Sequence, residues 1–72
     1  MNVSLLWGVL RRNHCSVAKL SKHLGIAVTT GYRKLDGKTE FTRKEIAIIR
    51  KVFNLTYGEL IDIFFNEKGL TL

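Results

Sequence analysis

The sequence has no proline, a single cysteine and only six acidic residues. Without proline, nothing interrupts a helix from within. The lone Cys15 excludes a disulfide framework and indicates an intracellular protein. The apolar start of the chain is short and is followed by Arg11 and Arg12, so neither a signal peptide nor a membrane span fits it. We therefore expect a cytoplasmic protein that contacts no membrane.

Basic residues are the strongest feature of the composition. The chain of 72 residues includes twelve Lys and Arg, for a net charge of +6, and residues 1–51 hold all of these except Lys68. A basic body favours a polyanion such as DNA, or an acidic protein patch, as its partner. The alternative is that lysines on solvated helix faces only keep the protein soluble. A chain of this length predicts one small domain over residues 1–72.

Residues 16–25 have the pattern of a short helix. Val17, Leu20 and Leu24 recur at helical spacing and predict one buried stripe. Ser16 stands where its hydroxyl can accept a backbone N–H as an N-cap. Gly25 follows the last apolar residue, where a left-handed conformation closes a helix at least cost.

A second short helix is expected after a connection of about four residues. Thr29 or Ala27 can open it, Tyr32 and Leu35 are expected on one face, and Gly37 ends it. Two short helices joined by a tight turn containing a glycine predict a helix-turn-helix over about residues 16–37.

Three further helices flank this motif. The first is expected over residues 2–13, with Asn2 or Ser4 as its N-cap and with Trp7 in the core rather than exposed as a partner anchor. Its inward stripe is predicted to hold Leu6, Val9, Leu10 and in addition Val3.

Two capping boxes mark the starts of the last two helices. Thr42 with Glu45, and Thr56 with Glu59, have the required spacing. The helices that follow are expected to end near residue 53 and near Asn66. The chain therefore predicts an all-α fold of five short helices around a central helix-turn-helix.

Residues 17–65 resemble the small Cro- and repressor-type helix-turn-helix proteins of temperate phages. The resemblance lies in Leu20-Ser21 and Gly25-Ile26, in the twelve-residue step from Gly25 to Gly37, and in the run 32–42. The whole chain also resembles the modulator-of-repression antirepressors of lactococcal phages. These resemblances imply a lambda-repressor-like fold and a location in the cytoplasm of a bacterial host.

The sequence departs from the family pattern in and near its recognition helix. Family members that read DNA usually begin the motif with Gln and continue with polar residues, but this chain has Val17, Ala27 and Val28 there. Gly31 replaces an apolar residue and costs the helix about 1 kcal/mol relative to Ala. A glycine face also allows close approach by a partner's backbone. A protein surface is therefore a rival to DNA as the ligand.

Catalytic and metal chemistry have little support in the sequence. No nucleophile elbow and no phosphate-binding glycine loop is present. His14, Cys15 and His23 lack a fourth ligand and the usual metal-binding spacing. We expect no enzyme activity, no catalytic residue, no cofactor and no metal.

DNA binding would place the start of the recognition helix against base edges in the major groove. Arg33 is the side chain suited to bidentate contact with guanine, and Thr29 or Thr30 could touch thymine methyls or phosphates. The candidates for contact with bases or with a partner are Val28, Thr29, Thr30, Tyr32 and Arg33, to which Ala27 is added for base contact. The candidates for phosphates or an acidic surface are Lys19, Lys22, Lys38, Arg43 and Lys44.

The last helix is too apolar around its circumference for a surface helix of a small domain. Some of its apolar side chains should remain uncovered and support association. The candidates are Ile61, Phe64 and Phe65. A Cro-like protein would use them to form a homodimer, because two half-sites require two modules.

Two functions follow for a phage regulator of the choice between lysis and lysogeny. The antirepressor resemblance, together with Val17, Val28 and Gly31, favours binding to the cognate phage repressor, which would change the repressor's DNA binding. The alternative is a Cro-like homodimeric repressor that binds operator DNA through its own recognition helix.

Overall fold

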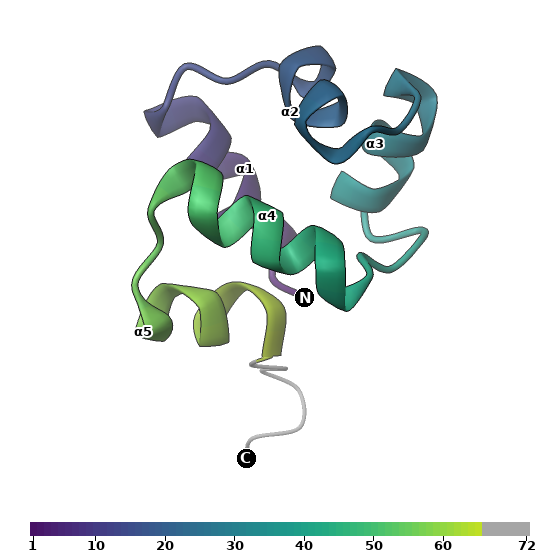
Figure 1. The fold of residues 1–72 in the computed structure, drawn as a ribbon. Coiled ribbons are helices and arrows are strands. Elements are labelled where there is room, and N and C mark those ends of the chain that lie inside the picture. The colour runs from purple at the N-terminus through teal and green to yellow at the C-terminus, as the bar shows by residue number, and fades with distance from the viewer. Residues whose placement is uncertain (66–72) are drawn as a thin grey trace.

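The computed structural model describes residues 1–65, which are helical throughout apart from short connections. The α-helices are α1 (Val3–Arg12), α2 (Val17–Leu24), α3 (Val28–Leu35), α4 (Arg43–Phe53) and α5 (Tyr57–Leu60), and a π-helical turn, η1 (Ile61–Phe65), continues α5 (Figure 1). The expected all-α fold with five helices is confirmed over these residues. None of the helices in this range is long and apolar enough to cross a membrane.

The predicted N-caps fix four of the five helix starts. Asn2, rather than Ser4, opens α1, with its side-chain oxygen accepting from the Leu5 N–H. Ser16 opens α2 in the same way. Both capping boxes are present, with Thr42 and Glu45 opening α4 and Thr56 and Glu59 opening α5. Each such cap contributes about 1 kcal/mol.

Each of the first four helices is followed within two residues by a residue in the left-handed conformation. At the end of α2, the Gly25 N–H donates to Lys22 and the Ile26 N–H donates to Ser21, which is the hydrogen-bond pattern of a Schellman motif. Gly25 and Gly37 were expected to end their helices, and they do. The other two helices end without a glycine, and the four left-handed residues are His14, Gly25, Gly37 and Asn54.

The core lies where α1, α2, α3, α4 and η1 meet. Leu6, Leu20, Leu35 and Ile49 are among its fully buried side chains. Trp7 is half-buried and packs against this cluster, so it lies at the edge of the core rather than within it. Within the predicted stripe of α1, Leu6, Val9 and Leu10 are buried and Val3 is half-buried.

The end of the last helix differs from the expectation. Its α-helical part stops at Leu60, and the wider π-helical turn places Ile63 in the core, with its carbonyl oxygen 2.6 Å from the Asn2 N–H. Phe64 packs edge-on against Phe41, with ring centroids 5.8 Å apart. The predicted end at Asn66 lies outside the described residues.

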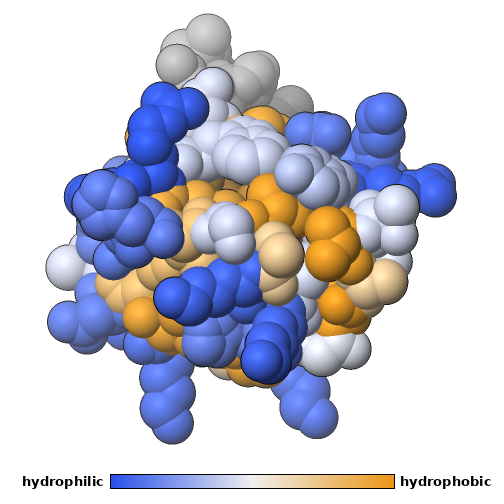
Figure 2. Space-filling view, turned by 90° about the horizontal axis from the view of Figure 1, so that it is seen from above, coloured by the Kyte–Doolittle hydropathy of each residue, from blue (hydrophilic) through white to orange (hydrophobic). Residues whose placement is uncertain are grey.

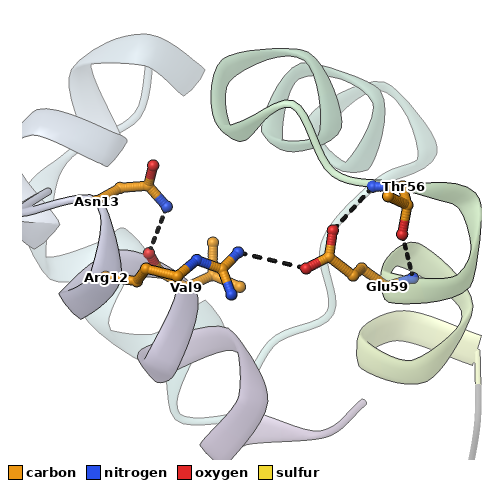
Figure 3. A network of polar contacts seen from close by, with 5 residues as sticks. All are labelled: Val9, Arg12, Asn13, Thr56 and Glu59. Atoms are coloured by element: carbon orange, nitrogen blue, oxygen red, sulfur yellow. Dashed lines mark hydrogen bonds and ion pairs between the residues drawn. The ribbon is translucent and has the colours of Figure 1, made fainter.

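The helices divide into a presented pair and a supporting group. Figure 1 shows α2 and α3 together at the top of the molecule, with α4 crossing below them and α5 underneath. An ion pair joins α1 to α5, with Nη2 of Arg12 lying 3.4 Å from Oε2 of Glu59 (Figure 3). Asn13 stays with its own helix, since its side-chain nitrogen donates to the Val9 carbonyl. The supporting helices α1, α4 and α5 therefore do not cover the outer faces of α2 and α3.

Candidate nucleic-acid interface

The two helices of the motif pack closely against each other at Gly31 of α3 and Ser21 of α2. Gly31 is buried, and a Cβ atom placed on it would collide with the Ser21 hydroxyl oxygen and lie 3.4 Å from Cγ1 of Val17. Gly31 therefore allows α3 to lie close to α2. The expectation that Gly31 gives a partner an open face is wrong, because α2 already occupies that face. Val17 is buried in the same contact.

The outward face of α3 carries the predicted recognition residues. Val28 is 43% exposed and Tyr32 is 49% exposed. Thr29 and Arg33 are exposed as well, whereas Thr30 is half-buried. These residues remain predicted contacts, and the structure leaves four of the five on the open side of the helix.

Tyr32 and Leu35 do not share a face, contrary to the expectation. Leu35 is fully buried with Gly31 and Lys34, while Tyr32 points to solvent. The buried side of α3 is thus set by positions 31, 34 and 35, which recur at helical spacing.

The first turn of α3 has free backbone donors. Ala27 precedes the helix in an extended conformation and makes no side-chain hydrogen bond to it. Ala27, rather than Thr29, is the residue that opens α3 at its N-cap position, and the helix begins at Val28 without a side-chain cap. Unpaired N–H groups at a helix start carry partial positive charge. The start of α3 is therefore open to an anionic or hydrogen-bonding ligand.

Five exposed cations lie on the elements that neighbour α3 in the structure. They come from α2, from the loop after α3 and from the first turn of α4, and none forms an ion pair within the part of the chain that the structure describes. Figure 2 looks onto the end of the molecule that carries α2 and α3, where hydrophilic side chains project around the rim and hydrophobic surface lies between them. We call these five residues the basic rim: Lys19, Lys22, Lys38, Arg43 and Lys44.

One lysine of α3 has a different role, which the sequence analysis missed. Lys34 is buried, and its Nζ lies 2.6 Å from Oε1 of Glu45 and 3.3 Å from the Glu40 carbonyl oxygen. The same Glu45 oxygen accepts the Thr42 N–H of the capping box at 2.8 Å. Lys34 therefore holds the last turn of α3, the following loop and the start of α4 together. The spacing of Gly31, Lys34 and Leu35 could have placed this lysine on the buried side.

The environment of Glu45 favours its charged form. Burial by itself raises the pKa of this carboxyl, but the hydrogen bonds from Lys34 and Thr42 and the charge of Lys34 outweigh burial and lower the pKa below its ordinary value of 4.5. The ion pair is therefore intact at neutral pH.

The predicted association residues are covered to different degrees. Phe65 is 57% exposed, whereas Ile61 and Phe64 are half-buried. Phe64 and Phe65 line a hollow of about 340 Å³ with Met1 and Phe41. Phe65 is therefore the most accessible of the three.

Neither a metal cluster nor a reactive thiol marks this surface. Residues 1–65 contain no group of three His, Cys, Asp or Glu side chains that could hold an ion. Cys15 is half-buried, and burial raises the pKa of its thiol, which disfavours the thiolate.

Residues 5–66 match the model of one protein family, described as the Cro/C1-type helix-turn-helix DNA-binding domain. No curated protein and no solved structure gives a match to the chain. The family match covers every helix of the structure except the first two residues of α1.

Proposed function

The chain belongs to the family of Cro/C1-type helix-turn-helix DNA-binding domains, and from this premise we propose that it is a transcription regulator that places α3 in the major groove of double-stranded DNA. The observation that carries the proposal is the outward face of α3, where Arg33 and Thr29 are exposed. The fold buries the other side of the helix, so only this face can meet a base pair.

Arg33 is the candidate for reading a base. Its guanidinium is exposed and has no ion-pair partner within residues 1–65, so binding DNA breaks no internal contact. A guanidinium fits the O6 and N7 acceptors of guanine with two parallel hydrogen bonds. We assign it the recognition of one guanine in the half-site.

The basic rim is the candidate for the phosphates. Its members come from α2, from the loop after α3 and from the first turn of α4, and we assign them to the phosphates of the two strands that border the groove. Each cation that neutralises a phosphate releases counterions, and binding weakens as salt rises. Phosphate contacts position the protein, while Arg33 supplies selectivity.

This proposal ranks DNA above a repressor as the ligand of α3. Val17 and Gly31 were two of the three residues that favoured a protein partner, and both are buried between α2 and α3. Their departure from the family pattern has an explanation in packing, because a buried valine fits beside a glycine. Val28 alone of the three stays exposed.

The test uses a duplex selected from a random library and a shuffled duplex of equal length. Fluorescence anisotropy with the Arg33→Ala variant should show a loss of about 1–3 kcal/mol for the selected duplex and reduced preference over the shuffled one. Arg50→Ala is the matched control, because Arg50 is exposed and lies over the Tyr57 ring at the start of α5, on the opposite side of the molecule from α3 (Figure 1). An equal effect of both substitutions contradicts the role of Arg33.

The second candidate function is that of an antirepressor which binds a phage repressor through the same face. The exposed Val28 and Tyr32 favour it, since apolar and aromatic side chains are common at protein interfaces. The phage setting, in control of lysis and lysogeny, rests on the resemblance of the sequence. Size-exclusion chromatography of the protein mixed with the repressor at micromolar concentration tests it, and separate elution of the two proteins contradicts it.

Homodimer formation belongs to the proposal as the means of reading two half-sites. The exposed Phe65 supplies an apolar contact for it. Sedimentation equilibrium should give a dimer for the protein and a monomer for Phe65→Ser. A monomer at all concentrations, with and without DNA, contradicts this part.

A further inference from the structure

The outward face of α3 consists of two parallel rows with different chemistry. Val28 and Tyr32 are four residues apart and form an apolar row, and Thr29 and Arg33 are four residues apart and form a polar row beside it. The buried positions on the other side fix the rotation of the helix, so both rows point outward together.

The apolar row lies on a helix that also exposes the cation Arg33, and the elements next to this helix carry the exposed cations of the basic rim. Val28 and Tyr32 expose 43% and 49% of their surface, and Figure 2 shows hydrophilic side chains around the end of the molecule that carries α2 and α3. A ligand that fits this face must therefore be negative at its borders and must offer apolar groups between them. A major groove has this arrangement, with a phosphate backbone on each side and the C5-methyl groups of thymines on its floor.

We infer that Val28 and Tyr32 read thymine methyl groups, so that the DNA ligand carries thymine next to the guanine bound by Arg33. The inference rests on the proposed function, since it specifies the DNA that α3 binds. It accounts for the apolar start of this recognition helix within a DNA-binding role: Val28 has no hydrogen-bonding side chain, yet a methyl group is a feature that an apolar side chain can recognise.

The recognised group is small and can be removed without changing base pairing. Uracil differs from thymine only by the absence of the C5-methyl group, and both pair with adenine in the same way. Removing one buried methyl group from an apolar contact weakens binding by about fourfold. A contact with the phosphates or with hydrogen-bonding groups would not respond to this change.

The experiment starts from a duplex selected out of a random thymine-containing library by the unmodified protein. Each thymine of that duplex is replaced by uracil in turn, and the dissociation constant is measured by anisotropy. At one or two positions near the selected guanine the replacement should weaken binding by about fourfold. With Val28→Ala the same replacement should cost less than about twofold at one of these positions, because the methyl group has lost its partner. Val52→Ala is the matched control, since Val52 is an exposed valine on α4, and it should keep the full fourfold response.

Tyr32 is tested in the same way. Tyr32→Ala should abolish the response at the second thymine, while Tyr57→Ala, at an exposed tyrosine on α5, should leave it unchanged. Both substitutions are at exposed side chains, so folding is retained and is checked by circular dichroism.

The outcomes separate the inference from the function on which it rests. Selective binding that is lost with Arg33→Ala but is indifferent to uracil at every position overturns the inference and leaves the proposed function standing. Failure of the folded protein to enrich any sequence from the library overturns the proposed function, and the inference with it. A uracil effect that persists in full in Val28→Ala and in Tyr32→Ala also overturns the inference.

Discussion

Gly31 and Ser21 are in such close contact that neither position can enlarge independently. A Cβ atom on Gly31 would collide with the Ser21 hydroxyl oxygen, and this hydroxyl is buried without a hydrogen-bond partner among the described residues. The contact sets how closely the recognition helix lies on α2, and so where its outward face stands relative to the basic rim.

This contact predicts a coupled pair of substitutions. Gly31→Ala alone should lower the free energy of unfolding by about 1–2 kcal/mol, since overpacking outweighs the gain in helix propensity. Ser21→Ala should raise it slightly by removing an unpaired buried hydroxyl. The double variant should be at least as stable as the original protein. Gly8→Ala is the control, because a Cβ there meets nothing within 4 Å, and it should stabilise by about 1 kcal/mol. Urea unfolding gives all four values, and additive effects of the two substitutions contradict the contact.

Breaking the buried ion pair between Lys34 and Glu45 should lower the free energy of unfolding more than breaking the exposed pair between Arg12 and Glu59. Lys34→Met leaves the Glu45 carboxylate without its cation and should cost about 2–3 kcal/mol, less than a fully buried pair because both side chains keep some solvent contact. Arg12→Ala breaks an exposed pair with Glu59 and should cost no more than about 1 kcal/mol. Glu45→Ala removes both the pair and the capping box and should cost more than Lys34→Met. Equal losses for Lys34→Met and Arg12→Ala in urea unfolding would refute the role of Lys34.

Stability should fall on acidification. In the folded protein, burial raises the pKa of Glu45, but Lys34 and Thr42 outweigh burial and lower this pKa below its ordinary value of 4.5. The pKa of Glu59 is also lowered, chiefly by the hydrogen bond from the Thr56 N–H. For a carboxyl with a lowered pKa, the unfolded chain binds the proton first as pH falls. The contribution is therefore complete above pH of about 5 and is lost as pH falls through the folded pKa. Unfolding curves between pH 7 and 3 should show this loss, and Glu45→Gln should reduce it. A loss of the same size in that variant would assign it to other groups.

The basic rim predicts a defined salt dependence. If all five cations meet phosphates, the logarithm of the association constant should fall with the logarithm of salt concentration with a slope of about −4.5. Lys44→Ala should weaken binding to every duplex similarly and reduce the slope by about 1. Lys51→Ala, an exposed lysine near the other end of α4, should leave the slope unchanged. A slope insensitive to Lys44 contradicts its assignment to a phosphate.

Local signals were enough to predict most of the helix boundaries. Asn2, Ser16, Thr42 and Thr56 each cap a helix through interactions within three residues, and such interactions can be recognised in a sequence. The ends expected near residues 13 and 53 are confirmed, but the left-handed conformation of His14 and Asn54 was not predicted, because it is adopted there by residues other than glycine. The π-helical turn was also missed, since its register is set by the packing of Ile63 in the core.

The exposed residues of the candidate site could be predicted from the sequence, but the buried contacts that hold the site in place could not. The exposed candidates of α3 and the basic rim follow from spacing and charge. The structural roles of Gly31 and Lys34 depend on which residues of α2 and α4 lie opposite them, and such contacts between helices do not follow from the spacing within one helix. A glycine on a recognition helix suggested an open face, and its true environment is a close helix contact.

We propose that the outward face of α3, together with the basic rim, is the DNA-binding surface of this protein. The most direct test is to follow the backbone amide signals of the labelled protein by NMR while a selected duplex is added. We expect the largest shifts at residues 28–33 and at the basic rim, and unchanged signals for Arg50 and Tyr57. Shifts centred on Phe65 or on the start of α5, with α3 unaffected, would contradict this proposal.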